Sequence, residues 1–332
     1  MKHNKRRNGF GFVAATVVMA GVLSGCGGQT DSAEQQQDSS EVKKQETQQQ
    51  ESQRERENKT QTPRSYVIEK AETESGEEAD KPDQEETAPK EAVTFSIVGD
   101  SISTYLWDIP EGYYPFYPEN GAVKDRQDTW WQMFMDDTGS VLYANASSSG
   151  STCTGDSTSM DDPQCSCDEL RVSDLNGPEG LIPDAILIYM GTNDLLKSIP
   201  LGTNDGTVPV TEGNIQNFSD AYTLMLDKLE REYPVSEIYC CTLTQIATWS
   251  DGGVLTEFVN GVDEGLTAAD YSACIEKIAK NRGLSVVDLY GCGIGEENWS
   301  EVTTDGVHPT PEGMRYIAKA VEQGLGFEGS TN

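Results

Sequence analysis

Five short apolar stretches, alternating with segments of helical spacing, constrain the fold of this chain most strongly. They cover residues 95–98, 140–144, 184–190, 237–243 and 284–290. Between them, apolar side chains recur at helical spacing from Phe218 to Leu229 and from Tyr271 to Ile278, and a last set runs from Met314 to Val321. Strands that alternate with helices in this way predict an α/β fold with a mostly parallel sheet.

Local signals set the limits of the predicted helices. Asp128 is a good N-cap residue for a helix that Gly139 ends, and Gly283 ends the helix that contains Tyr271. Thr310 followed by Pro311 marks the start of the last helix, because proline is favoured at the first helical position.

The first 90 residues are not expected to join this fold. Residues 1–26 combine a basic start with a short apolar stretch and end in Leu23-Ser24-Gly25-Cys26, which resembles the lipobox of bacterial lipoproteins. The resemblance implies a lipid anchor on Cys26 and a membrane-attached protein that faces outside the cytoplasm; an ordinary secretory signal or an uncleaved anchor are the alternatives. Residues 27–90 are almost devoid of large apolar side chains and predict a disordered tether, which leaves 91–332 as the folded domain.

The predicted domain is strongly acidic. Residues 91–332 hold 39 aspartates and glutamates against 11 lysines and arginines, a net charge of −28. Such a surface repels nucleic acid and anionic lipid headgroups, so neither is an expected partner, and contact with the membrane is expected only through the lipid anchor. Simple solubility is the alternative explanation and accounts for most of the acidity.

Seven cysteines follow Cys26. Cys240 and Cys241 lie within a predicted strand and are expected to be buried. Cys153 could form a disulfide with Cys165 or Cys167 in an exported protein, and the sequence does not decide between the pairings.

A long segment rich in aromatic residues follows the first strand. Three prolines between residues 105 and 127 exclude a helix there. Its aromatic residues are Tyr105, Trp107, Tyr113, Tyr114, Phe116 and Tyr117. Tyr105 and Trp107, with Trp249 and Trp299 from later segments, could stack on sugar rings; packing of the loop onto the domain is an equally good explanation.

Histidine limits the chemistry of the site. His3 lies in the predicted signal segment, so His308 is the only histidine expected in the mature protein. A histidine base must therefore be His308, and a metal site with several histidine ligands is excluded. Asp305 lies three residues earlier, and on a tight turn its carboxylate can reach one ring nitrogen.

Ser101, Gly150 and Asn193 each come directly after a predicted strand. The carboxyl ends of parallel strands form the rim at which ligands bind in such sheets. Taken alone, Ser101 is also an ordinary turn or N-cap residue and His308 an ordinary surface histidine.

The motifs at these positions resemble, block by block and in order, the SGNH (GDSL) hydrolase superfamily. They are Gly99-Asp100-Ser101, Gly150, Gly191-Thr192-Asn193-Asp194 and Asp305-Gly306-Val307-His308. The resemblance implies a flavodoxin-like three-layer α/β/α fold with a five-stranded sheet, Ser101 as nucleophile, His308 as base and Asp305 as the residue that orients it. It places the oxyanion hole at the Ser101 and Gly150 N–H groups and the Asn193 side chain, although three serines before Gly150 allow a register shift of one or two residues. No metal or cofactor is implied.

The resemblance also implies a serine hydrolase that cleaves ester bonds. The aromatic segment and the predicted surface anchor favour an O-acyl carbohydrate, with acetyl as the acyl group, as the substrate. A lysophospholipase or thioesterase, or a non-catalytic sugar-binding lipoprotein, are the alternatives; the intact serine, histidine and aspartate argue against the last.

Overall fold

The computed structural model of the chain describes residues 92–247 and 265–327. The predicted signal segment with Cys26, the predicted tether at 27–90 and the aromatic residue Trp249 lie outside these described residues.

The described part of the chain is built on a parallel five-stranded sheet with the order β2-β1-β4-β6-β7. Counted along the chain, this is the 2-1-3-4-5 order of flavodoxin-like folds, so the predicted fold class is confirmed. The strands are β1 (Thr94–Gly99), β2 (Val141–Ser147), β4 (Ala185–Tyr189), β6 (Glu237–Cys241) and β7 (Ser285–Val287).

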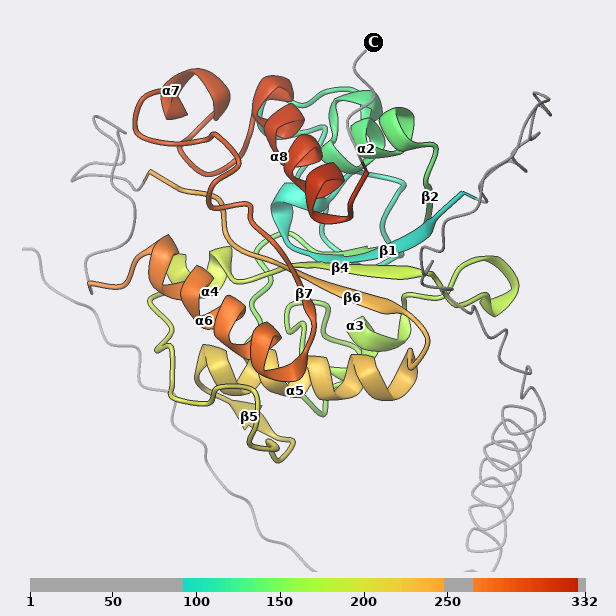
Figure 1. Cartoon of the computed structure of the whole chain (residues 1–332), viewed down its shortest axis with the longest axis vertical. Helices are drawn as coiled ribbons and strands as arrows, with labels where there is room; N and C mark the ends of the chain where they lie inside the picture. The colour runs from blue at the N-terminus through green and yellow to red at the C-terminus, as the bar shows by residue number, and fades with distance from the viewer. Residues whose placement is uncertain (1–91, 248–264, 328–332) are drawn as a thin grey trace, which may run out of the picture. The chain divides into compact units, whose positions relative to one another are not determined.

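Helices cover both faces of this sheet (Figure 1). On one side lie α2 (Trp130–Thr138) and α8 (Pro311–Gly324), and on the other lie α3 (Glu169–Ser173), α5 (Phe218–Glu232) and α6 (Ala268–Arg282). The described residues also form two short helices, α4 (Thr192–Leu196) and α7 (Trp299–Val302), and a small antiparallel pair, β3 (Gly155–Asp156) and β5 (Asn214–Ile215). Three short 3₁₀ turns are present as well, of which η3 (Pro178–Gly180) precedes β4. Strand β4 is buried over its whole length, as expected for a central strand between two helical layers.

Side-chain caps explain where the helices begin, and a glycine in the left-handed conformation explains where α6 ends. Thr310 accepts a hydrogen bond from the Gly313 N–H at the start of α8, and Gly283 ends α6 in the left-handed conformation, both as predicted. The predicted N-cap Asp128 is wrong by one residue: Thr129 caps α2 by accepting from the Gln132 N–H, and Asp128 belongs to the preceding 3₁₀ turn η2 (Arg126–Asp128).

The seven cysteines of the described residues are free thiols. Cys153, Cys165 and Cys167 are buried close together, and the Cys165 and Cys167 sulfurs lie 3.4 Å apart. A pairing of Cys153 with either of them, one of the possibilities left open by the sequence, is not present in the structure.

Candidate active site

The turn after β1 presents Ser101 at the rim of the sheet. Gly99 ends the strand at a crowded position, since a Cβ there would lie 2.6 Å from the Ser147 Oγ. Asp100 then accepts a hydrogen bond from the Ile102 N–H at 3.0 Å and starts the 3₁₀ turn η1 (Ser101–Ser103). Burial raises the pKa of Asp100, and this hydrogen bond only partly opposes the shift. Ser101 is thereby held at a fixed place above the end of β1.

His308 and Asp305 meet Ser101 from the far end of the chain. The His308 Nε2 lies 3.0 Å from the Ser101 Oγ, and the His308 Nδ1 lies 2.7 Å from the Asp305 Oδ2. The other carboxylate oxygen of Asp305 accepts from the Val307 and His308 N–H groups, at 3.0 Å and 2.8 Å. In this arrangement the imidazole can take the proton of the serine hydroxyl, while the aspartate carboxylate fixes the orientation of the ring.

The surroundings of Asp305 favour the ionised form of its carboxyl group. Partial burial opposes its ionisation, but the hydrogen bond and charge of the His308 side chain, with the two backbone N–H groups, outweigh burial and lower the pKa of Asp305. The carboxylate therefore stays negative at neutral pH.

Three hydrogen-bond donors near this triad have no acceptor among the described residues. They are the Ser101 N–H, the Gly150 N–H and the buried Asn193 Nδ2. The backbone N–H groups around Gly150 are already hydrogen-bonded. Those of Ser148, Ser149 and Ser151 donate to the carbonyls of Gly99, Tyr114 and Ser148, respectively. Of the residues from 148 to 151, Gly150 alone keeps an unpaired N–H, and its φ of +79° suits glycine. Within this block the Gly150 N–H is therefore the one left open to a ligand, and its place in the oxyanion hole stays a prediction.

Asp194, next to Asn193, ties two parts of the site together. Its carboxylate accepts from the Cys153 N–H at 2.8 Å and from the Thr154 N–H and hydroxyl at 3.3 Å and 3.1 Å. Burial raises the pKa of Asp194 to about 6, although these hydrogen bonds favour the charged form. Asp194 thus links α4, which carries Asn193, to the segment that follows Gly150.

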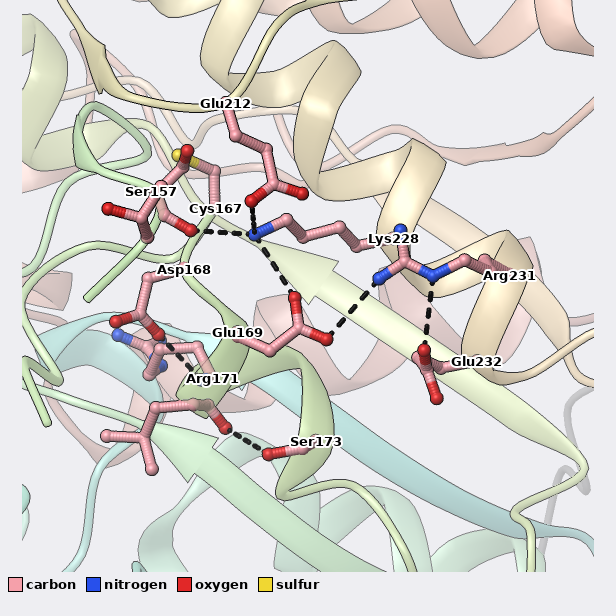
Figure 2. Close-up of polar contacts among 12 residues, drawn as sticks. Ser157, Cys167, Asp168, Glu169, Arg171, Ser173, Glu212, Lys228, Arg231 and Glu232 are labelled. Carbon is pink, nitrogen blue, oxygen red and sulfur yellow. Dashed lines mark hydrogen bonds and ion pairs between the residues drawn. The ribbon is translucent and has the colours of Figure 1, made fainter. Parts of the chain in front are cut away.

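The structure also contains two buried cations, Arg171 and Lys228, which the sequence did not reveal. The Arg171 guanidinium donates to the carbonyls of Gly99, Ala146 and Pro163 at 2.8, 2.9 and 2.6 Å. It therefore joins the ends of β1 and β2 directly below the Ser101 and Gly150 turns. Lys228 is equally buried and reaches the Ser157 carbonyl at 2.8 Å and Glu169 at 3.3 Å (Figure 2).

The aromatic segment after Ser101 contains buried and exposed members. Tyr113 and Tyr117 are buried, and the Tyr117 hydroxyl donates to the Pro309 carbonyl at 3.4 Å. Trp107 and Tyr114 are 88% and 55% exposed, and the Tyr114 backbone bonds both Ser148 and Ser149 beside Gly150.

The remaining predicted stacking residues are placed differently. Tyr105 packs against the core and donates to the Lys124 carbonyl at 2.9 Å. Trp299 is half-buried at the start of α7, and its carbonyl accepts from Thr303 just before the Asp305 turn. Both side chains thus lie partly within the packing of the domain.

Phe116 is the residue of this segment whose position the sequence did not indicate. Its ring stacks on the His308 imidazole with 3.7 Å between ring centroids and 9° between planes. The sequence marked it only as one of six aromatics in a loop.

The described ranges contain no cluster of three or more histidine, cysteine, aspartate or glutamate side chains able to hold a metal ion. In the same ranges, no helix has the length and apolar character needed to cross a bilayer.

Comparison with known proteins agrees with this architecture. Residues 93–254 match the family model for GDSL-like lipases and acylhydrolases. A Bacteroides uniformis protein considered to be a GDSL-like lipase has a similar structure, with 23% identity, a TM-score of 0.50, and coverage of 70% of this chain and 95% of its own. A Lactobacillus plantarum protein matches with 21% identity, a TM-score of 0.52, and coverage of 70% and 96%. No curated protein matches the chain.

The α/β fold and the serine, histidine and aspartate at its rim define a serine hydrolase. The match of residues 93–254 to the GDSL-like lipases and acylhydrolases indicates that the bond cleaved by this hydrolase is an ester.

Proposed function

We propose that this enzyme removes O-linked acyl groups, acetyl above all, from carbohydrate outside the cytoplasm, with Ser101, His308 and Asp305 as its catalytic triad. The observation that carries the proposal is the continuous set of contacts from Ser101 through His308 to Asp305, beside three donors that have no acceptor within residues 92–247 and 265–327.

The geometry supports a two-step acyl transfer. The Ser101 Oγ attacks the ester carbonyl carbon while the His308 Nε2 takes the hydroxyl proton. The carbonyl oxygen becomes an oxyanion that accepts hydrogen bonds from the Ser101 N–H, the Gly150 N–H and the Asn193 Nδ2. The imidazolium then donates its proton to the leaving alcohol as the carbon–oxygen bond breaks, which leaves an acyl group on Ser101.

Water completes the cycle by the same route. His308 removes a proton from the water that attacks the acyl carbon, and returns a proton to the Ser101 Oγ when the carboxylic acid leaves. Asp305 holds the ring in one tautomer and balances the positive charge of the imidazolium in both steps.

Two features support carbohydrate as the alcohol part of the ester. Trp107 and Tyr114 expose aromatic rings on the segment that borders the site, and the Tyr114 backbone is fixed to the residues before Gly150. Flat aromatic faces suit the apolar faces of sugar rings. The net charge of −28 over residues 91–332 disfavours anionic lipid surfaces.

The sequence of the first 26 residues supports lipid attachment at Cys26. Metabolic labelling with an alkyne fatty acid should tag the wild type and leave Cys26→Ala unlabelled. An equal signal from both would contradict the anchor.

A serine-reactive fluorophosphonate tests the nucleophile. The wild type should form a covalent adduct and Ser101→Ala should form none, with Ser103→Ala as a matched control on the same turn. If the wild type fails to react under conditions that label a known esterase, the triad assignment is wrong.

Acetate release tests the substrate. The wild type should release acetate from acetylated xylan, acetylated mannan or acetylated peptidoglycan faster than it hydrolyses a lysophospholipid. Hydrolysis of the lipid alone would refute the carbohydrate proposal and leave the triad intact. An enzyme that binds the polymers but turns over no ester would refute both.

A further inference from the structure

The Phe116 ring is the only aromatic ring stacked face to face on His308 among the described residues. With a centroid separation of 3.7 Å and an interplanar angle of 9°, one whole face of the imidazole is covered. The Asp305 contact to Nδ1 fixes one edge of the ring but leaves rotation about the axis through that hydrogen bond open. A parallel ring on one face restricts that rotation.

Phe116 is itself connected to the turn that carries the nucleophile. Its N–H donates to the Thr104 Oγ1 at 2.9 Å, and the Thr104 hydroxyl donates to the Ser101 carbonyl at 3.0 Å. The contacts therefore form a closed circuit from Ser101 through Thr104 and Phe116 to His308, and from the His308 Nε2 back to the Ser101 Oγ at 3.0 Å.

The next residues strengthen the same connection. The buried Tyr117 donates its hydroxyl to the carbonyl of Pro309, the residue after His308. The Leu106 N–H bonds the Tyr117 carbonyl at 2.9 Å, so the segment is held to the chain that leaves the Ser101 turn.

We propose that Phe116 and Thr104 are positioning residues that act as one unit to hold the His308 ring in line with the Ser101 hydroxyl. This rests on the proposed catalytic roles of Ser101 and His308. Neither Phe116 nor Thr104 exchanges a proton with substrate; both act through the orientation of the base. Because small displacements of catalytic groups cost large factors in rate, the unit should affect turnover more than binding.

The test compares variants of the full chain on 4-nitrophenyl acetate. Phe116→Leu, which removes the ring but keeps an apolar side chain, should lower kcat by about 10- to 100-fold with little change in KM. Phe116→Tyr, which keeps the ring, should stay within about threefold of the wild type in kcat. Thr104→Val should lower kcat by a similar factor, and Thr104→Ser, which keeps the hydroxyl, should not.

Two controls separate positioning from a general loss of packing. Phe134→Leu removes an aromatic ring from the core, where it packs on Phe95 and Phe327, and should lower the Tm without lowering kcat. The Thr104→Val/Phe116→Leu double variant should be no slower than the slower single variant, since residues that act as a unit are not additive.

An NMR signature follows the stack directly. In protein labelled with ¹³C-histidine, the Cε1–H signal of His308 should lie upfield in the wild type and in Phe116→Tyr, and move downfield in Phe116→Leu. His308→Gln assigns the signal against that of His3.

The inference fails if Phe116→Leu keeps wild-type kcat, if the kcat losses of the two single variants multiply in the double variant, or if the upfield shift is absent from the wild type. A wild type that shows the shift but hydrolyses no ester would refute the esterase function instead.

Discussion

Asp194→Asn is the substitution whose effect on stability should depend most clearly on pH. The Asp194 carboxylate is fully buried, and its hydrogen-bond donors in the described part of the chain are the N–H groups of Cys153 and Thr154 and the Thr154 hydroxyl. The positive charge of the exposed Lys197 also lowers its pKa slightly. Burial raises its pKa from 3.8 to about 6. Asparagine keeps the size of the side chain and one acceptor oxygen but cannot ionise.

The sign and size of the effect follow from that shift. A carboxyl group with a raised folded-state pKa stabilises the fold fully below the unfolded pKa of 3.8, and this stabilisation is lost as the pH rises through about 6. The total change is about 3 kcal/mol, of which about 2 kcal/mol falls between pH 4.5 and 7.5. The variant lacks this loss, so its unfolding free energy minus that of the wild type should rise by about 2 kcal/mol over the same range.

Urea unfolding at several pH values, followed by tryptophan fluorescence, measures this difference. Asp156→Asn is the matched control, because the exposed Asp156 accepts from the Thr158 hydroxyl and N–H and its pKa is lowered by them. The unfolding free energy of Asp156→Asn minus that of the wild type should fall slightly as the pH rises. If the unfolding free energy of Asp194→Asn minus that of the wild type stays flat or falls with pH, burial does not raise the pKa of Asp194 and the reasoning is wrong.

Three further substitutions have definite expected outcomes. His308→Ala should lose activity by roughly 10³- to 10⁶-fold in kcat, and retained turnover would contradict the triad, since His3 is the only other histidine of the chain. Asn193→Ala should lower kcat by about 10²- to 10³-fold with little change in KM in steady-state kinetics, as expected for a donor to the oxyanion; a rise in KM alone would point to substrate binding instead. Lys228→Met should lower the unfolding free energy by about 1–3 kcal/mol in urea while kcat stays unchanged, because the Ser157 carbonyl and Glu169 lose a buried partner that contacts no member of the triad; a loss of kcat in the folded variant would speak against a structural role.

The sheet could be predicted from the sequence because its strands are short, apolar and followed by turn residues. The end of the last strand could not. Residues 284–290 form one apolar run, but β7 stops at Val287, since the Thr242 hydroxyl accepts the N–H groups of Leu289 and Tyr290 in place of a neighbouring strand. A contact across more than 40 residues decides that boundary, and no local pattern contains it.

The cap of α2 shows a different limit. Asp128 and Thr129 are adjacent and both suit an N-cap, so the sequence does not rank them. The structure selects Thr129, whose hydroxyl accepts from the Gln132 N–H, because η2 already takes up Asp128.

Some residues of the site could be predicted from the sequence, and others could not. Ser101, Gly150 and Asn193 stand directly after predicted strands, so their common location at the rim followed from the topology alone. Phe116 has no such signal: it lies in a loop without periodicity and meets a partner 192 residues further along the chain. The burial of Arg171 could not be predicted either, since a single arginine near a short helix is ordinarily exposed.

The unpredicted residues matter because the predicted ones are not held by the strands alone. Ser101 and Gly150 come from turns after two different strands, and the relative position of two turns is set by what joins them. Arg171 joins them from below, through the Gly99 and Ala146 carbonyls, and desolvation of its charge is offset by the three carbonyls that surround it. A guanidinium can satisfy three carbonyls in one plane, whereas a lysine ammonium is a single point of charge. Arg171 thus adds to the direct pairing of β1 with β2 in holding Ser101, the proposed nucleophile, near Gly150, a proposed oxyanion donor.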